Sequence, residues 1–136
     1  MRIMAIDYGD TRTGIAVSDE SASLAGEAWV LSEKNRDTLV QIITDEATAR
    51  GVGLIVVGYP KNMNGTIGPR AEKSAQLAEE IRARCSFEVV LWDERMTTMS
   101  AHRILTDAGR HGKKRKKTID AVAASLILES YLGSVG

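Results

Sequence analysis

The sequence predicts a layered α/β domain built on a mixed five-stranded sheet with helices on both faces. Two observations support this fold class. Apolar runs at residues 2–7, 14–18 and 26–31 are separated by turn-like segments, which is typical of an antiparallel meander. Later apolar runs at 53–58 and 87–92 alternate with helical patterns, as in parallel strands joined by helical crossovers.

The helices are predicted from spacing and from their end signals. Residues 36–50 carry apolar side chains at helical spacing, and Pro69 is well placed to begin a second helix. Thr97 or Thr98 is expected to cap a third helix that ends before Gly109. The last helix is expected from Thr118 to about Leu132, after a basic loop. The predicted order is β-β-β-α-β-α-β-α-α, within a single domain spanning 1–136.

Composition excludes several classes of protein. No apolar run approaches the roughly 20 residues that span a bilayer, and the N-terminus lacks the pattern of a signal peptide. The only cysteine, Cys85, rules out an intramolecular disulfide and provides no metal-site spacing. These features predict a cytoplasmic protein. No stretch has the pattern of an exposed apolar interface, which favours a monomer.

The net charge of zero hides an uneven distribution. Residues 103–117 hold seven basic side chains and one acid, so this window carries +6 and the rest of the chain −6. Such a run is typical of a phosphate-binding segment, and equally of a solvated loop. The candidate nucleic-acid contacts are Arg12, Lys61, Arg70, Arg110, Lys113, Lys114, Arg115, Lys116 and Lys117.

Acids on three separate elements are the candidate chemistry. Asp7 ends the first strand, Asp93 and Glu94 end the last, and Asp120 lies at the start of the last helix. Carboxylates that gather repel one another, so a cation is expected between them, and oxygen-only ligands favour Mg²⁺ or Mn²⁺. Two such ions can activate water in phosphodiester cleavage. Each acid taken singly also fits a structural role, as a turn residue, a helix-end residue or an exposed loop residue.

Four segments carry a resemblance to a known family. They are MAIDYGDTRTGIAVSDE, VVGYPKNMNGTIGPRAEKSAQLAEEI, WDERMTTMSAHRIL and KKRKKTIDAVAASLILESYL. Together they resemble the YqgF family, also called RuvX, whose members are described as Holliday junction resolvases and as pre-16S rRNA nucleases. The resemblance implies an RNase H-like fold and makes Asp7, Glu94 and Asp120 the catalytic, metal-binding acids. The choice of Glu94 over Asp93 rests on the family pattern, and no fourth acid is identified.

The leading expectation is a metal-dependent nuclease acting on structured nucleic acid, with RNA processing slightly favoured over cleavage of a DNA junction. One alternative hypothesis is a nucleotide-binding protein, because the hairpin at residues 6–20 also resembles the phosphate-binding hairpin of the actin and hexokinase superfamily. The chain has too few residues for a second nucleotide-clasping domain, so no nucleotide cofactor is expected. The other rival is a non-catalytic module that binds RNA or the transcription or translation machinery and needs no metal.

Overall fold

The computed structural model describes residues 1–62, 64–85, 87–94 and 112–135, and within the last range it describes the side chains of residues 121–134. The strands are β1 (Arg2–Asp7), β2 (Thr13–Ser18), β3 (Ala25–Leu31), β4 (Val52–Tyr59) and β5 (Glu88–Asp93). The helices are α1 (Arg36–Ala49), α2 (Pro69–Arg84) and α4 (Gly112–Val135). The five predicted strands are confirmed to within about one residue at each end.

The strands form one mixed sheet in the order β3-β2-β1-β4-β5. β1 pairs antiparallel with β2, and β2 pairs antiparallel with β3, so the first three strands form the predicted meander. β4 pairs parallel with both β1 and β5. The strands β1, β4 and β5 therefore end at the same edge of the sheet, which we call the carboxyl edge.

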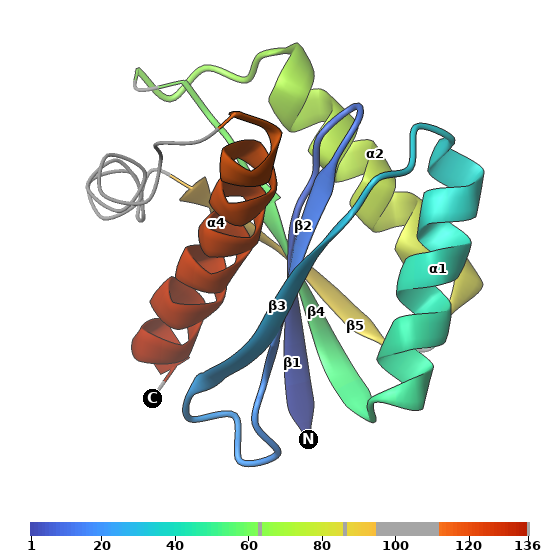
Figure 1. Ribbon diagram of the computed structural model, residues 1–136, viewed down its shortest axis with the longest axis vertical. Helices are drawn as coiled ribbons and strands as arrows, with labels where there is room; N and C mark the ends of the chain where they lie inside the picture. The colour runs from blue at the N-terminus through green and yellow to red at the C-terminus, as the bar shows by residue number, and fades with distance from the viewer. Residues whose placement is uncertain (63, 86, 95–111, 136) are drawn as a thin grey trace.

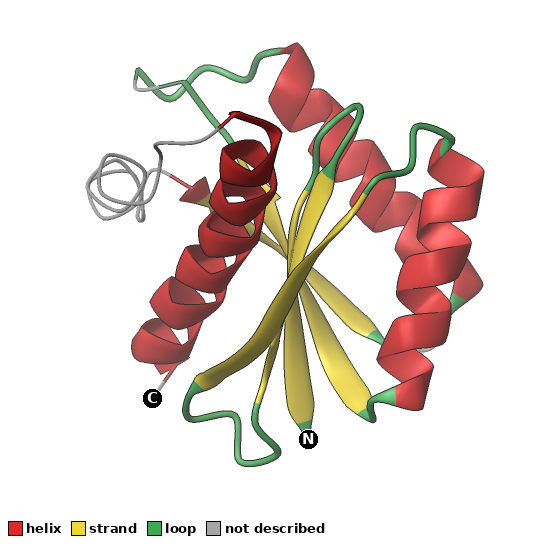
Figure 2. Ribbon diagram, in the orientation of Figure 1, coloured by secondary structure: helices red, strands yellow, loops and turns green. Residues whose placement is uncertain are grey.

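Helices cover both faces of this sheet (Figures 1 and 2). α1 and α2 pack on one face, over a core that includes Met4, Ile6 and Ile55. α4 packs on the other face, where Ala124, Ile127 and Leu128 contact a second core. The layered α/β architecture predicted from the sequence is confirmed. Among the described residues, no helix has both the length and the apolar character needed to cross a membrane.

The predicted start of the last helix was wrong. α4 begins at Gly112, six residues before the expected cap at Thr118, so Thr118 lies inside the helix and not at its cap. Lys and Arg are good helix formers, and no Gly or Pro interrupts the chain between Gly112 and Thr118. The five basic residues expected in a loop, 113–117, therefore lie in the first turns of α4. The helix expected between Thr97 and Ala108 falls outside the described residues.

Candidate active site

Asp7 lies at the carboxyl edge as the last residue of β1, with a relative exposure of 8%. Side chains alternate between the two faces of a strand, and Ile3 and Ala5 of β1 both pack in the core under α4. Asp7 follows them at the same spacing, so it belongs to the face that α4 covers. A carboxylate this deeply buried requires compensation from its surroundings.

Glu94 comes directly after β5, at the same edge. Trp92 of β5 packs in the core under α4, so Glu94 falls on the α4 face and Asp93 on the opposite one. Burial raises the pKa of Glu94 to about 7, and the negative charges of Asp7 and Asp93 add to this effect, whereas Arg70 opposes it. The carboxylates of Asp7 and Glu94 are thus close enough to repel each other, although 87 residues separate them in the chain.

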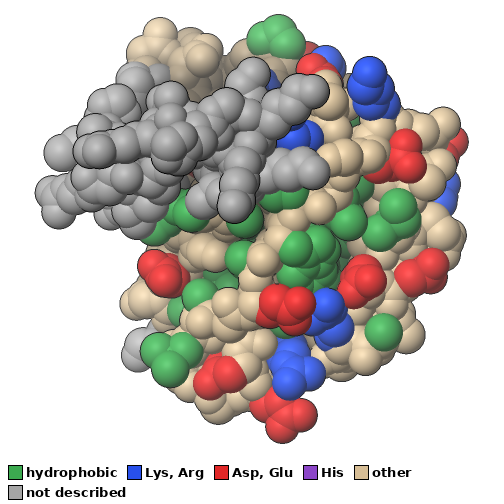
Figure 3. Space-filling model, in the orientation of Figure 1, with side chains coloured by type: hydrophobic (Ala, Val, Ile, Leu, Met, Phe, Trp, Pro, Cys, Tyr) green, Lys and Arg blue, Asp and Glu red, His purple; other side chains and the backbone are tan. Residues whose placement is uncertain are grey.

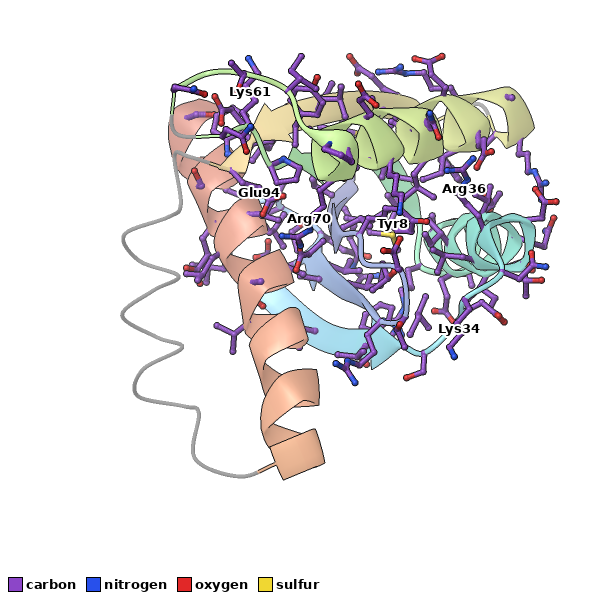
Figure 4. The ribbon with its side chains drawn as sticks, turned by 90° about the horizontal axis from the view of Figure 1, so that it is seen from above. Tyr8, Lys34, Arg36, Lys61, Arg70 and Glu94 are labelled. Carbon is purple, nitrogen blue, oxygen red and sulfur yellow. The ribbon has the colours of Figure 1, made fainter. Side chains whose placement is uncertain are left out.

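Arg70 brings a positive charge to these two acids from the first turn of α2. Its Nη2 lies 3.8 Å from Oδ1 of Asp7, while its side chain keeps 66% exposure. Figure 4 looks down on the carboxyl edge and shows Arg70 and Glu94 beside one another, next to α4. Pro69 immediately before Arg70 occupies the first helical position, where its fixed backbone angle favours helix formation. This turn holds Arg70 over the carboxylates.

α4 is fixed to β5 close to the acids. The indole Nε1 of Trp92 donates a hydrogen bond of 3.1 Å to Oγ of Ser130, and the ring of Trp92 meets Tyr131 edge-on. Asp120 lies seven residues before Ile127, which places its backbone two helical turns nearer the N-terminal end of α4 and on the same face. The side chain of Asp120 lies outside the described part of the structure.

The predicted phosphate contacts fall in different places. Arg12 is half-buried in the turn between β1 and β2, and Nζ of Lys61 lies 5.7 Å above the ring centre of Tyr59. Figure 4 shows Lys61 on the loop that leads from β4 to α2. Arg110 falls outside the described residues. The structure describes only the backbone of five further residues, all in α4: Lys113, Lys114, Arg115, Lys116 and Lys117. On the face seen in Figure 3, described acidic and basic side chains are interspersed.

Gly58 is a residue of this site that the sequence reasoning missed. It is buried near the end of β4. This strand lies between β1, which ends at Asp7, and β5, which Glu94 follows. A Cβ atom added to residue 58 would lie 2.7 Å from Oε2 of Glu94. The available signal was a glycine directly after the apolar run 54–57 of the strand, because a glycine inside a strand often marks a close approach by another group.

The donor set fits a hard divalent cation. Asp7 and Glu94 offer carboxylate oxygens, and Mg²⁺ is commonly held by one or two protein carboxylates together with water and substrate phosphate. Within the described ranges, no cluster of three His, Cys, Asp or Glu side chains has the arrangement of a metal site.

Comparison with known proteins places these residues in a family. Residues 1–134 match the sequence model of the family described as RuvX, Holliday junction resolvase. A Geobacillus kaustophilus protein named "Putative pre-16S rRNA nuclease" is 46% identical, over 98% of this chain and 99% of its own length. A Halothermothrix orenii protein of the same name is 42% identical, over 97% of this chain and 94% of its own length.

Solved structures show the same architecture at low sequence identity. RuvC of T. thermophilus, in complex with a Holliday junction substrate, has a TM-score of 0.66 at 10% identity and matches 99% of this chain and 96% of its own. The Fowlpox virus resolvase, in complex with Holliday junction DNA, has a TM-score of 0.61 at 12% identity and matches 99% of both chains. These likenesses confirm the RNase H-like fold. Because the family match extends over almost the whole sequence, the chain belongs to the RuvX family.

Proposed function

We propose that this protein is a metal-dependent nuclease that hydrolyses phosphodiester bonds in structured nucleic acid. The observation that carries the proposal is the meeting of Asp7 and Glu94 at the carboxyl edge, on the face covered by α4. Burial and the neighbouring charge of Asp7 raise the pKa of Glu94, so this pair of acids is poorly suited to stabilising a fold, and a cation between them would remove the repulsion. The nuclease names of the full-length relatives support the same reaction class.

Asp7 and Glu94 would hold Mg²⁺ or Mn²⁺, with Asp120 as a third acid from the α4 face. When bound, such a cation polarises a phosphate oxygen and lowers the pKa of coordinated water. The protein's own contribution is to fix the two carboxylates from rigid strand ends and to bury Asp7 away from bulk water. Arg70 is exposed enough to move from the acids to a phosphate oxygen of the substrate.

The basic residues would hold the nucleic-acid backbone. Five consecutive Lys and Arg residues belong to the first turns of α4, where positive charge is unfavourable beside the positive end of the helix dipole. A bound phosphate backbone would offset this cost. Arg12, Lys61, Arg70 and Arg110 would extend this contact. Phosphate contacts position a substrate without reading its sequence, and they make binding weaken steeply with salt.

We favour processing of a pre-16S rRNA end as the reaction, because relatives that match over 94–99% of their own length carry that name at more than 40% identity. We propose that this reaction takes place in the cytoplasm. Resolution of a DNA junction is the alternative, supported by the description of the family and by the junction complexes of the structural neighbours. An RNA end-trimming enzyme can work as a monomer, whereas a junction resolvase needs two active sites.

The test is cleavage of four labelled substrates, namely a precursor rRNA fragment, a four-way DNA junction, and a single strand of each. Each is incubated with Mg²⁺, Mn²⁺ or EDTA and with wild type, Asp7→Asn or Asp10→Asn. Asp10 is the matched control because it lies three residues away, is exposed, and pairs with Lys73 at 3.1 Å. We expect metal-dependent cleavage that only Asp7→Asn abolishes, and the preferred substrate distinguishes RNA from DNA. Cleavage that survives Asp7→Asn would contradict the proposed site. Metal-independent binding without cleavage of any substrate would instead indicate a non-catalytic module.

A further inference from the structure

Gly58 lies on the strand between the two acids of the candidate active site. β4 runs between β1 and β5, and the register pairs Ile6 with Val57 and Gly58 with Trp92. Gly58 is thus level with Asp7 on the neighbouring strand β1. On its other side it is level with Trp92 of β5, two residues before Glu94. Leu54 and Val56 pack in the core under α4, so alternation assigns residue 58 to that same face.

The space that a side chain at position 58 would fill is already taken. An ideal Cβ there would lie 2.7 Å from Oε2 of Glu94, 3.0 Å from its Cδ, and 2.7 Å from Cδ1 of Ile127. The carboxylate of Glu94 therefore lies directly over Gly58, the residue of β4 that is level with Asp7 on β1. Neighbouring strands are about 4.8 Å apart, so acids that originate on β1 and beyond β5 can converge only by reaching across β4.

We propose that Gly58 is a positioning residue, whose missing side chain creates the space in which the Glu94 carboxylate reaches toward Asp7. The inference rests on the proposed function, since it assumes that the two acids bind one cation together. It adds a role for a residue with no polar side chain. Glycine inside a strand weakens the strand, and here the approach of a carboxylate explains why a glycine is present.

The contacts at Gly58 allow its role to be separated from folding. All three nearest atoms are at the ends of side chains, and none belongs to the backbone. An alanine would therefore be accommodated by moving Glu94 and Ile127, without a change in the backbone of β4. Alanine also restricts the unfolded chain more than glycine does, which offsets part of the strain. The fold should survive the substitution, whereas the placement of the carboxylate should not.

The experiment measures Mn²⁺ binding by calorimetry, unfolding by urea in EDTA, and substrate cleavage, for wild type and Gly58→Ala. We expect Gly58→Ala to weaken Mn²⁺ binding roughly 10- to 100-fold, as is typical when a group that orients a metal ligand is altered. Cleavage should fall in parallel, while the urea midpoint stays near that of wild type. Gly53→Ala is the control, because it makes the same change on the same strand and its Cβ would meet only the flexible side chain of Met1 among its nearest neighbours.

Two further variants identify the path of the effect. In a Glu94→Gln background, Gly58→Ala should cause no additional loss of Mn²⁺ affinity, because its target is already altered. Ile127→Val removes the other clashing atom, so the double variant with Gly58→Ala should still bind Mn²⁺ weakly. Recovery of Mn²⁺ affinity in that double variant would overturn the proposal in favour of a packing effect. If Asp7→Asn does not bind Mn²⁺ but Gly58→Ala binds it within twofold of the wild-type affinity, the role of Gly58 would be overturned and the proposed metal site would stand. Unchanged Mn²⁺ binding in Asp7→Asn and Glu94→Gln would overturn the proposed metal site and the role of Gly58 together.

Discussion

Glu94→Gln should make the metal-free protein more stable at pH 8, although it removes a residue of the candidate active site. The pKa of Glu94 is raised from 4.5 to about 7, first by burial and then by the neighbouring charge of Asp7. In the unfolded chain this carboxyl loses its proton near pH 4.5, whereas in the folded protein it retains the proton up to about pH 7. Between these values the folded state binds more protons, so a rise in pH favours unfolding.

The size of the effect follows from the shift. Each pKa unit corresponds to about 1.4 kcal/mol, so a shift of roughly 2.5 units costs the folded state about 3 kcal/mol once the pH exceeds 7. Below pH 4.5 the cost is absent, because the carboxyl is protonated in both states. Glutamine has nearly the shape of the protonated acid and does not ionise. The variant should therefore match wild type at pH 4.5 and gain up to about 3 kcal/mol in free energy of unfolding by pH 8.

The assay is urea denaturation in EDTA at half-unit intervals from pH 4.5 to pH 8. Glu88→Gln, at the exposed start of β5, measures the effect of losing a carboxyl elsewhere on the same strand. The difference in unfolding free energy between Glu94→Gln and wild type should grow with pH across the window and then level off. A difference that stays constant with pH would refute the burial and charge coupling on which the candidate site depends.

Three further outcomes are expected. Mg²⁺ should raise the urea midpoint of wild type more at pH 8 than at pH 5.5, because Glu94, with a pKa of about 7, is ionised at pH 8 and only the ionised carboxylate binds the cation. Mg²⁺ should have no such effect on Asp7→Asn. Arg70→Ala should weaken nucleic-acid binding in fluorescence anisotropy and reduce the slope of log affinity against log salt by about 1. Arg84→Ala, at the other end of α2, is the control and should leave the slope unchanged. An unchanged slope in Arg70→Ala would exclude a phosphate contact. Trp92→Phe and Ser130→Ala should each cost about 1 kcal/mol in thermal or urea unfolding, and the double variant should cost less than their sum, because both remove the same hydrogen bond; full additivity would contradict that bond.

The strands were predictable because their signals are local. The run of residues 2–7 matches β1 at both ends, since an apolar stretch stops at a polar turn. The start of α4 was not predictable in the same way. Thr118 is a good capping residue, but nothing in the preceding basic run breaks a helix, so the capping signal was overridden by continuation of the helix. Local signals give candidate ends, and the neighbouring sequence decides among them.

The meeting of Asp7 and Glu94 was predictable only in outline. Both are acids at the ends of strands, and parallel strands place their carboxyl ends at one edge of the sheet. The strand order, which places β1 and β5 on either side of β4, is a property of the tertiary fold, and local sequence patterns do not determine it. The choice of Glu94 over Asp93 depended on a family resemblance, and alternation along β5 now gives it a physical reason, since Trp92 and Glu94 share the α4 face. Arg70 was expected to touch phosphate, and the structure adds its contact with Asp7.

Gly58 has no side chain that can bind a metal, donate a proton or attack a substrate, so no chemical group of its own marks it as a residue of the site. Its contribution is the volume it leaves to Glu94, which becomes visible only when β4 is seen between the two acids. Substituting Gly58 should therefore separate metal binding from stability more cleanly than substituting either acid.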